Sequence, residues 1–243
     1  MAVGALLGFG RHLPGPSISN DALAPSLGVT AAAIAEQTGI ATRHYVTPGL
    51  GPSDLGREAA QAALVQAGLT PDAVDLIVFA TMSPDVAFPG SGCYLQDKLG
   101  CRTVGALDVR AQCAGFLFAL ATADRFIRAG AAERVLVVGA EVHSTALERA
   151  PRAAHVTPIF GDGAGAILLG AAAEPGLLAV TLSSDPTDFE RFWCEFPASR
   201  NYPARMTHEA LAAGRHYYQL NAAAVHPQAE ATLVELGGEV LAN

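Results

Sequence analysis

The sequence predicts an α/β fold in which strands alternate with helices and pair into a largely parallel sheet. Residues 74–82 and 134–142 are continuous apolar runs, as expected for strands that are covered on both faces. Alanine-rich stretches of helical character lie beside them and end at glycines such as Gly68 and Gly100. This alternation implies βαβ units with right-handed crossovers.

The remaining elements follow from the same patterns. Strands are expected at residues 3–9, 74–82, 104–109, 134–142, 164–169 and 177–183, and helices at residues 29–38, 54–67, 91–99, 114–128, 210–225 and 228–241. Ser53 is expected to cap the second of these helices, because its hydroxyl can accept from an unpaired backbone N–H. Residues 185–204 are aromatic and irregular, and we interpret them as a long excursion from the sheet.

Composition limits the classes of function. A chain of 243 residues, 51% hydrophobic and 16% charged, predicts one or two tightly packed domains. The net charge of −8 argues against a nucleic-acid partner. The apolar start of the chain lacks a basic leader and is too short to span a membrane, so a cytoplasmic protein without a membrane partner is expected. The four cysteines lack metal-ligand spacing, which predicts reduced thiols and no metal site.

Cys113 is the candidate nucleophile. It follows an expected strand and a short polar turn, and it stands at the start of the apolar helix 114–128. The first N–H groups of a helix are unpaired and its dipole is positive there, which favours the reactive thiolate and places the Cys113 N–H to stabilise an oxyanion. The alternative is a small buried packing residue. Cys93 has a similar local setting, so the residue types alone leave both possibilities open.

Four segments, in order and with fitting spacing, carry a family resemblance. They are Gln37–His44 (QTGIATRH), Ala80–Asp85 followed by Phe88–Pro89, Asp108–Gly115 around the cysteine, and Phe160–Gly165 (FGDGAG). Together they resemble the β-ketoacyl-ACP synthase III branch of the thiolase superfamily. The resemblance implies a thiolase-like layered α/β/α/β/α fold. Residues 1–172 would form its complete first half, with the nucleophile, and residues 173–243 the opening of an incomplete second half.

The resemblance also implies a reaction. An acyl thioester, carried by CoA or by the phosphopantetheine of an acyl-carrier protein, would acylate Cys113. A malonyl thioester would then lose CO₂, and its carbanion would attack the acyl-enzyme to release a 3-oxoacyl product. No cofactor is required beyond these substrates. A homodimer is expected, formed through the strand at 104–109 and the loop of Phe88.

Further site residues are implied by position in the family. Phe88 would lie at the dimer interface and close the partner's acyl pocket, whereas the alternative is an ordinary loop hydrophobe. His143 and Phe160 would line the substrate pocket. For His143 the alternative is a catalytic base, which is disfavoured because a His that follows a strand is more often a satisfied structural group. Arg152 would contact the pantetheine or phosphate of the donor, and a solvated arginine is the alternative. The Gly161–Gly163 stretch is expected to be a tight turn that needs a permissive backbone.

Two departures from the family pattern shape the hypothesis. Ala33 and Gln37 stand where the family often presents Trp and Arg, which weakens CoA recognition and favours a carrier-protein-bound donor or an unusual acyl group. No segment before Asn243 resembles the family's catalytic His and Asn or its glycine-rich loop. The leading hypothesis is therefore a condensing enzyme whose sequence is truncated. The alternatives are an acyltransferase that works without decarboxylation and a non-catalytic partner subunit of a heteromeric synthase.

Overall fold

The computed structural model describes residues 2–174 and 176–242, which fold into two compact units. Unit 1 consists of Met1–Pro16, His44–Val142 and Asp162–Leu182, and unit 2 consists of Ser17–Arg43, His143–Gly161 and Ser183–Asn243. Each unit is thus assembled from three separate segments of the chain. The division into halves that meet between residues 172 and 173 stays a prediction.

Unit 1 is built around one mixed sheet. Its elements are β1 (Val3–His12), α3 (Pro52–Ala67), β4 (Leu76–Ala80), α4 (Ser91–Leu99), β5 (Gly105–Val109), α5 (Gly115–Arg128), β6 (Arg134–Glu141) and β7 (Gly163–Ala172). The strand order is β1-β7-β6-β4-β5. Strand β4 pairs in parallel with β5 and β6, while β7 runs antiparallel to both β6 and β1. The predicted parallel sheet is therefore mixed, because β7 returns beside β6 without a crossover helix in this unit.

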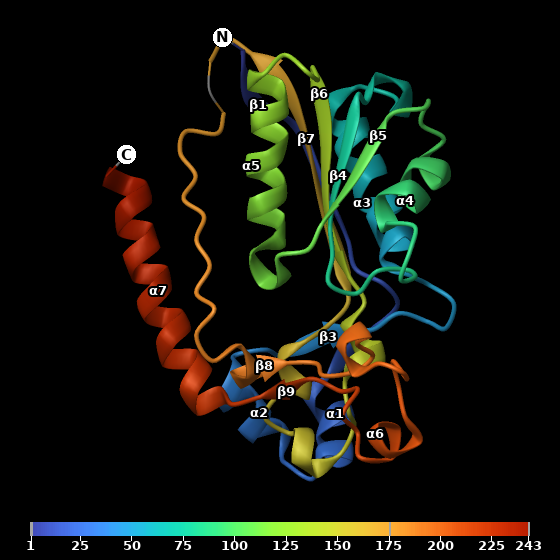
Figure 1. Cartoon of the computed structure of the whole chain (residues 1–243), viewed down its shortest axis with the longest axis vertical. Helices are drawn as coiled ribbons and strands as arrows, with labels where there is room; N and C mark the ends of the chain where they lie inside the picture. Colours follow the sequence, from blue (N-terminus) through green and yellow to red (C-terminus); the bar gives the residue numbers. More distant parts are fainter. Residues whose placement is uncertain (1, 175, 243) are drawn as a thin grey trace. The chain divides into compact units, whose positions relative to one another are not determined.

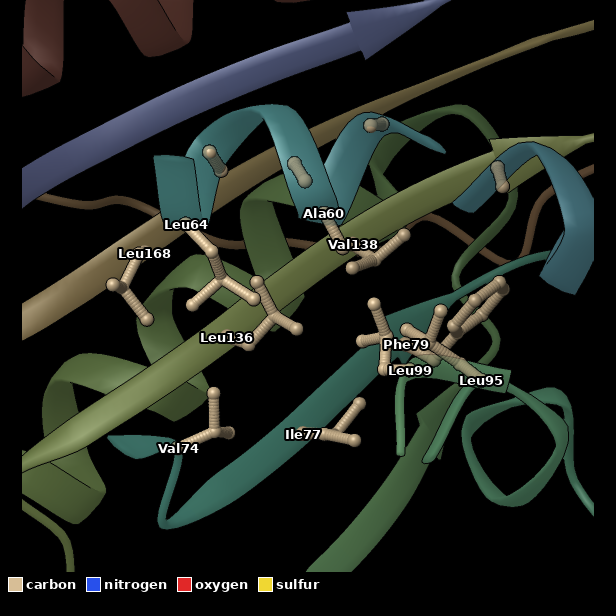
Figure 2. Packing of buried hydrophobic residues seen from close by; sticks show 14 residues of the cluster. Ala60, Leu64, Val74, Ile77, Phe79, Leu95, Leu99, Leu136, Val138 and Leu168 are labelled. Atoms are coloured by element: carbon tan, nitrogen blue, oxygen red, sulfur yellow. The ribbon is translucent and has the colours of Figure 1, made fainter. Parts of the chain in front are cut away.

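Helices cover both faces of this sheet, with α5 on one face and α3 and α4 on the other (Figure 1). Helix α3 lies very close to β1, since a Cβ on Gly10 would be 2.1 Å from the carbonyl oxygen of Ala59. Figure 2 shows the core on the α3 and α4 side, where Leu64, Ile77 and Leu136 lie together. All three side chains are buried, as the continuous apolar runs predicted for Ile77 and Leu136.

The opposite face of the sheet is covered by α5. Ala119, Ala123 and Ile127 recur every four residues, so they fall on one side of the helix and pack on the sheet. Asp124 is 2% exposed; it accepts from Gly4 N at 3.0 Å and from Arg128 Nε at 2.6 Å. A buried carboxylate with these partners is satisfied and fixes α5 to β1.

Unit 2 contains short elements. They are β2 (Ser17–Ser19), α1 (Asn20–Leu27), α2 (Ala31–Thr38), β3 (Thr42–His44), β8 (Phe192–Trp193), α6 (His208–Ala212), β9 (Gln219–Leu220) and α7 (Ala222–Ala242). Leu23, Leu27 and Ile34 form a small core between α1 and α2. The strands pair as β2 with β3 and β8 with β9.

Most predicted elements are confirmed, and two are wrong: the strand at 177–183 and the helix at 210–225. Helix α4 has the predicted bounds, and α5 and β6 agree within one residue. Helix α3 begins earlier than predicted, because Gly51 is its N-cap and Pro52, whose fixed φ suits a first helical position, precedes Ser53. Residues 177–183 form no strand, although Leu177 N and the preceding Gly176 N both donate to Gly4 O of β1.

The C-terminal helices also differ from the prediction. The expected helix at 210–225 ends at Ala212, because Gly214 adopts φ of 70°, which reverses the chain into β9. Helix α7 then runs continuously through Pro227, which lies in its second turn and lacks the backbone N–H that would donate to the carbonyl four residues earlier. Helix α1 was not predicted, since it is short and contains Pro25.

Candidate functional site

The carboxyl ends of the parallel strands β4, β5 and β6 meet at one edge of the sheet in unit 1, which is where α/β proteins commonly build their sites. Thr81 N donates to Val109 O at 3.3 Å and so ties the ends of β4 and β5. Glu141, at the end of β6, accepts from Met82 N at 2.8 Å and Ser83 N at 3.1 Å. The three strand ends are therefore held together by bonds to backbone groups.

Cys113 lies in the turn Gln112–Ala114, between β5 and α5, and is exposed. The bonds of this turn run from Ala114 N to Ala111 O and from Gly115 N to Gln112 O, so the Cys113 N–H takes part in neither. Gln112 has φ of 45°, a left-handed conformation that is uncommon outside glycine and is often found at functional sites. In the described chain the Cys113 side chain is exposed, whereas a packing residue is expected to be buried.

The start of α5 beside Cys113 is open. The preceding residue is Ala114, whose methyl group cannot accept a hydrogen bond from the first helical N–H groups. The 14-residue helix thus directs its positive end toward the turn that carries the sulfur. This arrangement suits a thiolate and an oxyanion, the two negative species of acyl transfer through cysteine.

Asp108 anchors the strand that leads to Cys113. Its carboxylate accepts from Ser91 N at 2.6 Å and from Gly92 N at 2.8 Å, at the start of α4. A Cβ on Gly90 would lie 2.6 Å from Asp108 Cγ, so only glycine leaves room for the carboxylate there. The sequence motif around Cys113 includes Asp108, but the pattern alone assigned it no role. The signal that could have revealed it is the Gly-Ser-Gly stretch that receives it.

Phe88 and Cys93 are the other notable exposed residues of unit 1. Phe88 lies between β4 and α4 and is 85% exposed. Both the interface role and the ordinary loop position predicted for Phe88 are compatible with this exposure. Cys93 lies in the first turn of α4 and is also exposed, so exposure alone does not distinguish it from Cys113.

Unit 2 holds the other predicted site residues. His143 is buried, and its Nδ1 is 2.9 Å from the hydroxyl oxygen of Tyr218. The ring centroids of His143 and Phe160 are 4.8 Å apart, and those of Phe160 and Tyr218 are 5.6 Å apart. Phe192 completes the cluster, 5.9 Å from Phe160. Sequence reasoning missed Tyr218 and Phe192, although both lie in aromatic stretches.

Arg152 lines a cavity of about 510 Å³ in unit 2. Its Nε lies 2.7 Å from Glu148 Oε2, and a second nitrogen bonds the other oxygen of that carboxylate. Hydrogen bonding to Glu148, and then the Glu148 charge, raise the pKa of Arg152. Arg215 lines the same cavity and pairs with Glu195. The structure thus places Arg152 beside a cavity, with its charge already matched by a carboxylate.

The remaining predicted positions are accounted for as follows. Ala33 is exposed on α2, and Gln37 donates to His155 O at 3.3 Å. Gly161 and Gly163 are not among the glycines with positive φ, so the expected permissive backbone is not what these positions require. Asp162 instead accepts from Val46 N at 2.7 Å and donates its own N–H to His44 O, which makes it a structural tie.

The described residues contain neither a membrane-spanning helix nor a cluster of metal-ligating side chains. No helix within residues 2–174 and 176–242 combines the length and the apolar character needed to cross a membrane. Over the same ranges, no three or more His, Cys, Asp and Glu side chains are grouped so that they could hold a metal ion.

Comparison with known proteins identifies the fold and the family. The family model described as 3-oxoacyl-acyl-carrier-protein synthase III matches residues 107–186, which include Cys113. The crystal structure of 3-oxoacyl-acyl-carrier-protein synthase III from Pseudomonas aeruginosa is 34% identical, with a TM-score of 0.85, and the match covers 98% of this chain and 70% of that one. The fold is therefore that of the thiolase-like condensing enzymes, as predicted. The chain belongs to the β-ketoacyl-ACP synthase III family.

Curated relatives agree with this assignment. β-Ketoacyl-acyl-carrier-protein synthase III of Bordetella petrii is 44% identical over 190 residues, which are 76% of this chain and 57% of the relative. That of Methylococcus capsulatus is 41% identical over 194 residues, which are 80% of this chain and 60% of the relative. The chain thus spans somewhat more than half the length of the curated relatives it matches.

Proposed function

We propose that the chain carries out acyl transfer through a thioester on Cys113. The Sγ thiolate attacks the carbonyl carbon of an acyl thioester, and the electron pair of the carbonyl moves onto its oxygen. Collapse of this intermediate breaks the bond to the donor sulfur, which leaves as a thiolate and takes a proton. The observation that carries the proposal is the exposed Cys113 at the open, positive start of α5.

The second step follows from the family. A malonyl thioester loses CO₂, and the electron pair of the broken C–C bond forms the carbanion. The carbanion attacks the acyl carbonyl, a new C–C bond forms, and the Cys113 thiolate leaves with its electrons restored. Acyl-CoA or acyl-carrier protein is the proposed acyl donor, without a further cofactor. The competing reaction transfers the acyl group to an alcohol, amine or thiol without decarboxylation.

A homodimer is part of the proposal. Strand β5 is at one end of the sheet order, so in the described chain it pairs with β4 alone. An edge strand presents free backbone donors and acceptors to a partner. The exposed Phe88 and the partly exposed Leu107 lie on or near this edge and provide apolar contact area. We place the dimer in the cytoplasm.

The test is the intact mass of the protein after incubation with acetyl-CoA, or with acetyl-carrier protein. The proposal expects a mass increase of one acetyl group, which Cys113→Ala abolishes. Cys93→Ala is the matched control, since it removes an exposed cysteine in the first turn of another helix and should leave acylation intact. Acylation that is absent, or that survives Cys113→Ala, contradicts the proposal.

Addition of malonyl-carrier protein to the acylated protein then distinguishes the two reactions. A 3-oxoacyl product with release of CO₂ supports condensation. Transfer of the acyl group to a small nucleophile without loss of CO₂ supports the competing acyltransferase.

A further inference from the structure

The segment 84–90, hereafter the Phe88 loop, is held at both ends. At its beginning, Asp85 Oδ1 accepts from Ser53 Oγ at 2.7 Å. The Asp85 N–H donates to Ser91 Oγ at 3.1 Å, which connects the beginning of the loop to the residue just after its end. Ser53 and Ser91 are fully buried, so these bonds are shielded from water.

Ser53 connects the loop to a charged pair on the neighbouring helices. Lys98 Nζ donates to Ser53 Oγ at 2.8 Å and lies 2.6 Å from Asp54 Oδ1. Asp54 Oδ2 accepts from Gly51 N at 2.9 Å, at the N-cap of α3. Lys98 of α4 thus bonds both Asp54 and Ser53 at the start of α3, and Ser53 in turn bonds Asp85 of the loop.

The space around Asp85 is shaped for its carboxylate. A Cβ on Gly51 would be 2.2 Å from Asp85 Oδ1, so a larger residue there would displace it. Asp85 Oδ2 is buried and has no hydrogen-bond partner within the described part of the chain. A buried acceptor left unpaired is costly, and such a group persists only where the surroundings fix it. The carboxylate is thus held in one place rather than free to follow the loop.

We propose that Asp85 is a positioning residue that fixes the Phe88 loop through Ser53 and Lys98. The inference rests on the proposed function and on the role that the family resemblance implies for Phe88, which is to close the acyl pocket of a second copy of this chain. Asp85 does not touch the substrate in this proposal. It determines where Phe88 stands, and therefore which acyl groups the pocket accepts.

The first test does not depend on activity. Hydrogen exchange of the amides of residues 85–90 is measured by mass spectrometry in the wild type, Asp85→Ala, Ser53→Ala and the double variant. Loss of a bond to a charged group corresponds to roughly tenfold or greater faster exchange. The double variant should exchange no faster than the faster single variant, since both remove the same contact. Asp97→Ala, an exposed acid of α4, is the control.

The proposal is overturned if the amides of residues 85–90 exchange at the wild-type rate in Ser53→Ala, a variant that leaves Asp85 in place. It is also overturned if Asp97→Ala accelerates their exchange as much as Asp85→Ala does. The second test compares acylation of Cys113 by acetyl, butyryl and octanoyl thioesters. Asp85→Ala and Ser53→Ala are expected to change the order of preference among these, whereas a purely structural loss would lower all three rates alike. If the wild type is not acylated at all, the proposed function fails while the exchange result still decides whether Asp85 holds the loop.

Discussion

Asp108 and Ser91 join the strand that leads to the candidate nucleophile with the helix that follows the Phe88 loop, because the Asp108 carboxylate accepts from Ser91 N at 2.6 Å. Cys113 lies five positions after Asp108, and Ser91 lies three positions after Phe88. The same carboxylate accepts from Gly92 N. The start of α4 is therefore a common anchor for Cys113 and for the Phe88 loop.

Replacement of Asp108 should loosen this anchor. Asp108→Ala removes two hydrogen bonds to a charged acceptor and leaves two N–H groups of α4 unpaired, which is expected to lower the free energy of unfolding by about 2 kcal/mol. Urea titration measures the change. The acylation rate of Cys113 should fall as well, because the strand end that carries it is less well fixed.

The control for this prediction is Asp97→Ala, which removes an exposed acid of the same helix. It is expected to change the unfolding free energy by less than about 0.5 kcal/mol. A wild-type unfolding curve for Asp108→Ala would contradict the anchoring role.

Glycines in neighbouring strands should respond very differently to alanine. In Gly10→Ala the new Cβ would lie 2.1 Å from Ala59 O and 2.7 Å from Ala62 Cβ, so α3 must move away from β1 at a cost of roughly 1–3 kcal/mol. In Gly165→Ala of β7 the Cβ meets no described atom within 4 Å, and stability should stay the same or rise slightly. Thermal unfolding of both variants checks this, and equal effects would contradict the close packing.

The sequence alone predicted most of the strands and helices of unit 1. Runs such as 74–82 and 134–142 are buried on both faces, and this type of strand has a strong signal in a single sequence. The failures have local causes. The strand expected at 177–183 depended on its apolar character, but a strand also needs a paired neighbour along its length, and the bonds to Gly4 O of β1 come from Gly176 and Leu177, where this stretch begins. The helix expected at 210–225 was interrupted at Gly214.

The site was predicted in part. A pattern of residue types could locate Cys113 and Phe88, since each lies in a continuous motif. It could not assign roles to Asp85 and Asp108, because their partners Ser53 and Ser91 are brought near only by the packing of α3 and α4. Likewise, the bond between His143 and Tyr218 joins residues 75 positions apart. Contacts of this length come from the tertiary fold.

The cysteines should differ in reactivity toward iodoacetamide at pH 7. Burial, followed by the charge of Asp72, raises the pKa of Cys101, while Arg102 acts weakly in the opposite direction. Because the thiolate is the nucleophile, Cys101 should be alkylated most slowly, and the exposed Cys113 at the start of α5 most rapidly. Peptide mass spectrometry measures each site. The same reaction in urea is the control, since unfolding should make the four rates similar, and a Cys101 that reacts as fast as Cys113 in the folded protein would contradict the prediction.

The ion pair of Asp54 and Lys98 should make stability depend on pH. Burial alone would raise the pKa of Asp54, but the hydrogen bonds from Lys98 and Gly51 N, together with the charges of Lys98 and Arg57, lower the pKa below its ordinary value. An acid whose pKa is lower in the folded state contributes stability above its unfolded pKa of about 4, and this contribution disappears as the pH falls through the folded value. Urea unfolding at pH 6 and pH 3 should therefore show a smaller difference in Asp54→Asn than in the wild type, with the loss concentrated at pH 6. Glu36→Gln, which changes an exposed acid of α2, should retain the wild-type difference. If Asp54→Asn loses the same free energy at both pH values, the charge of Asp54 does not contribute to folding and only its hydrogen bonds do.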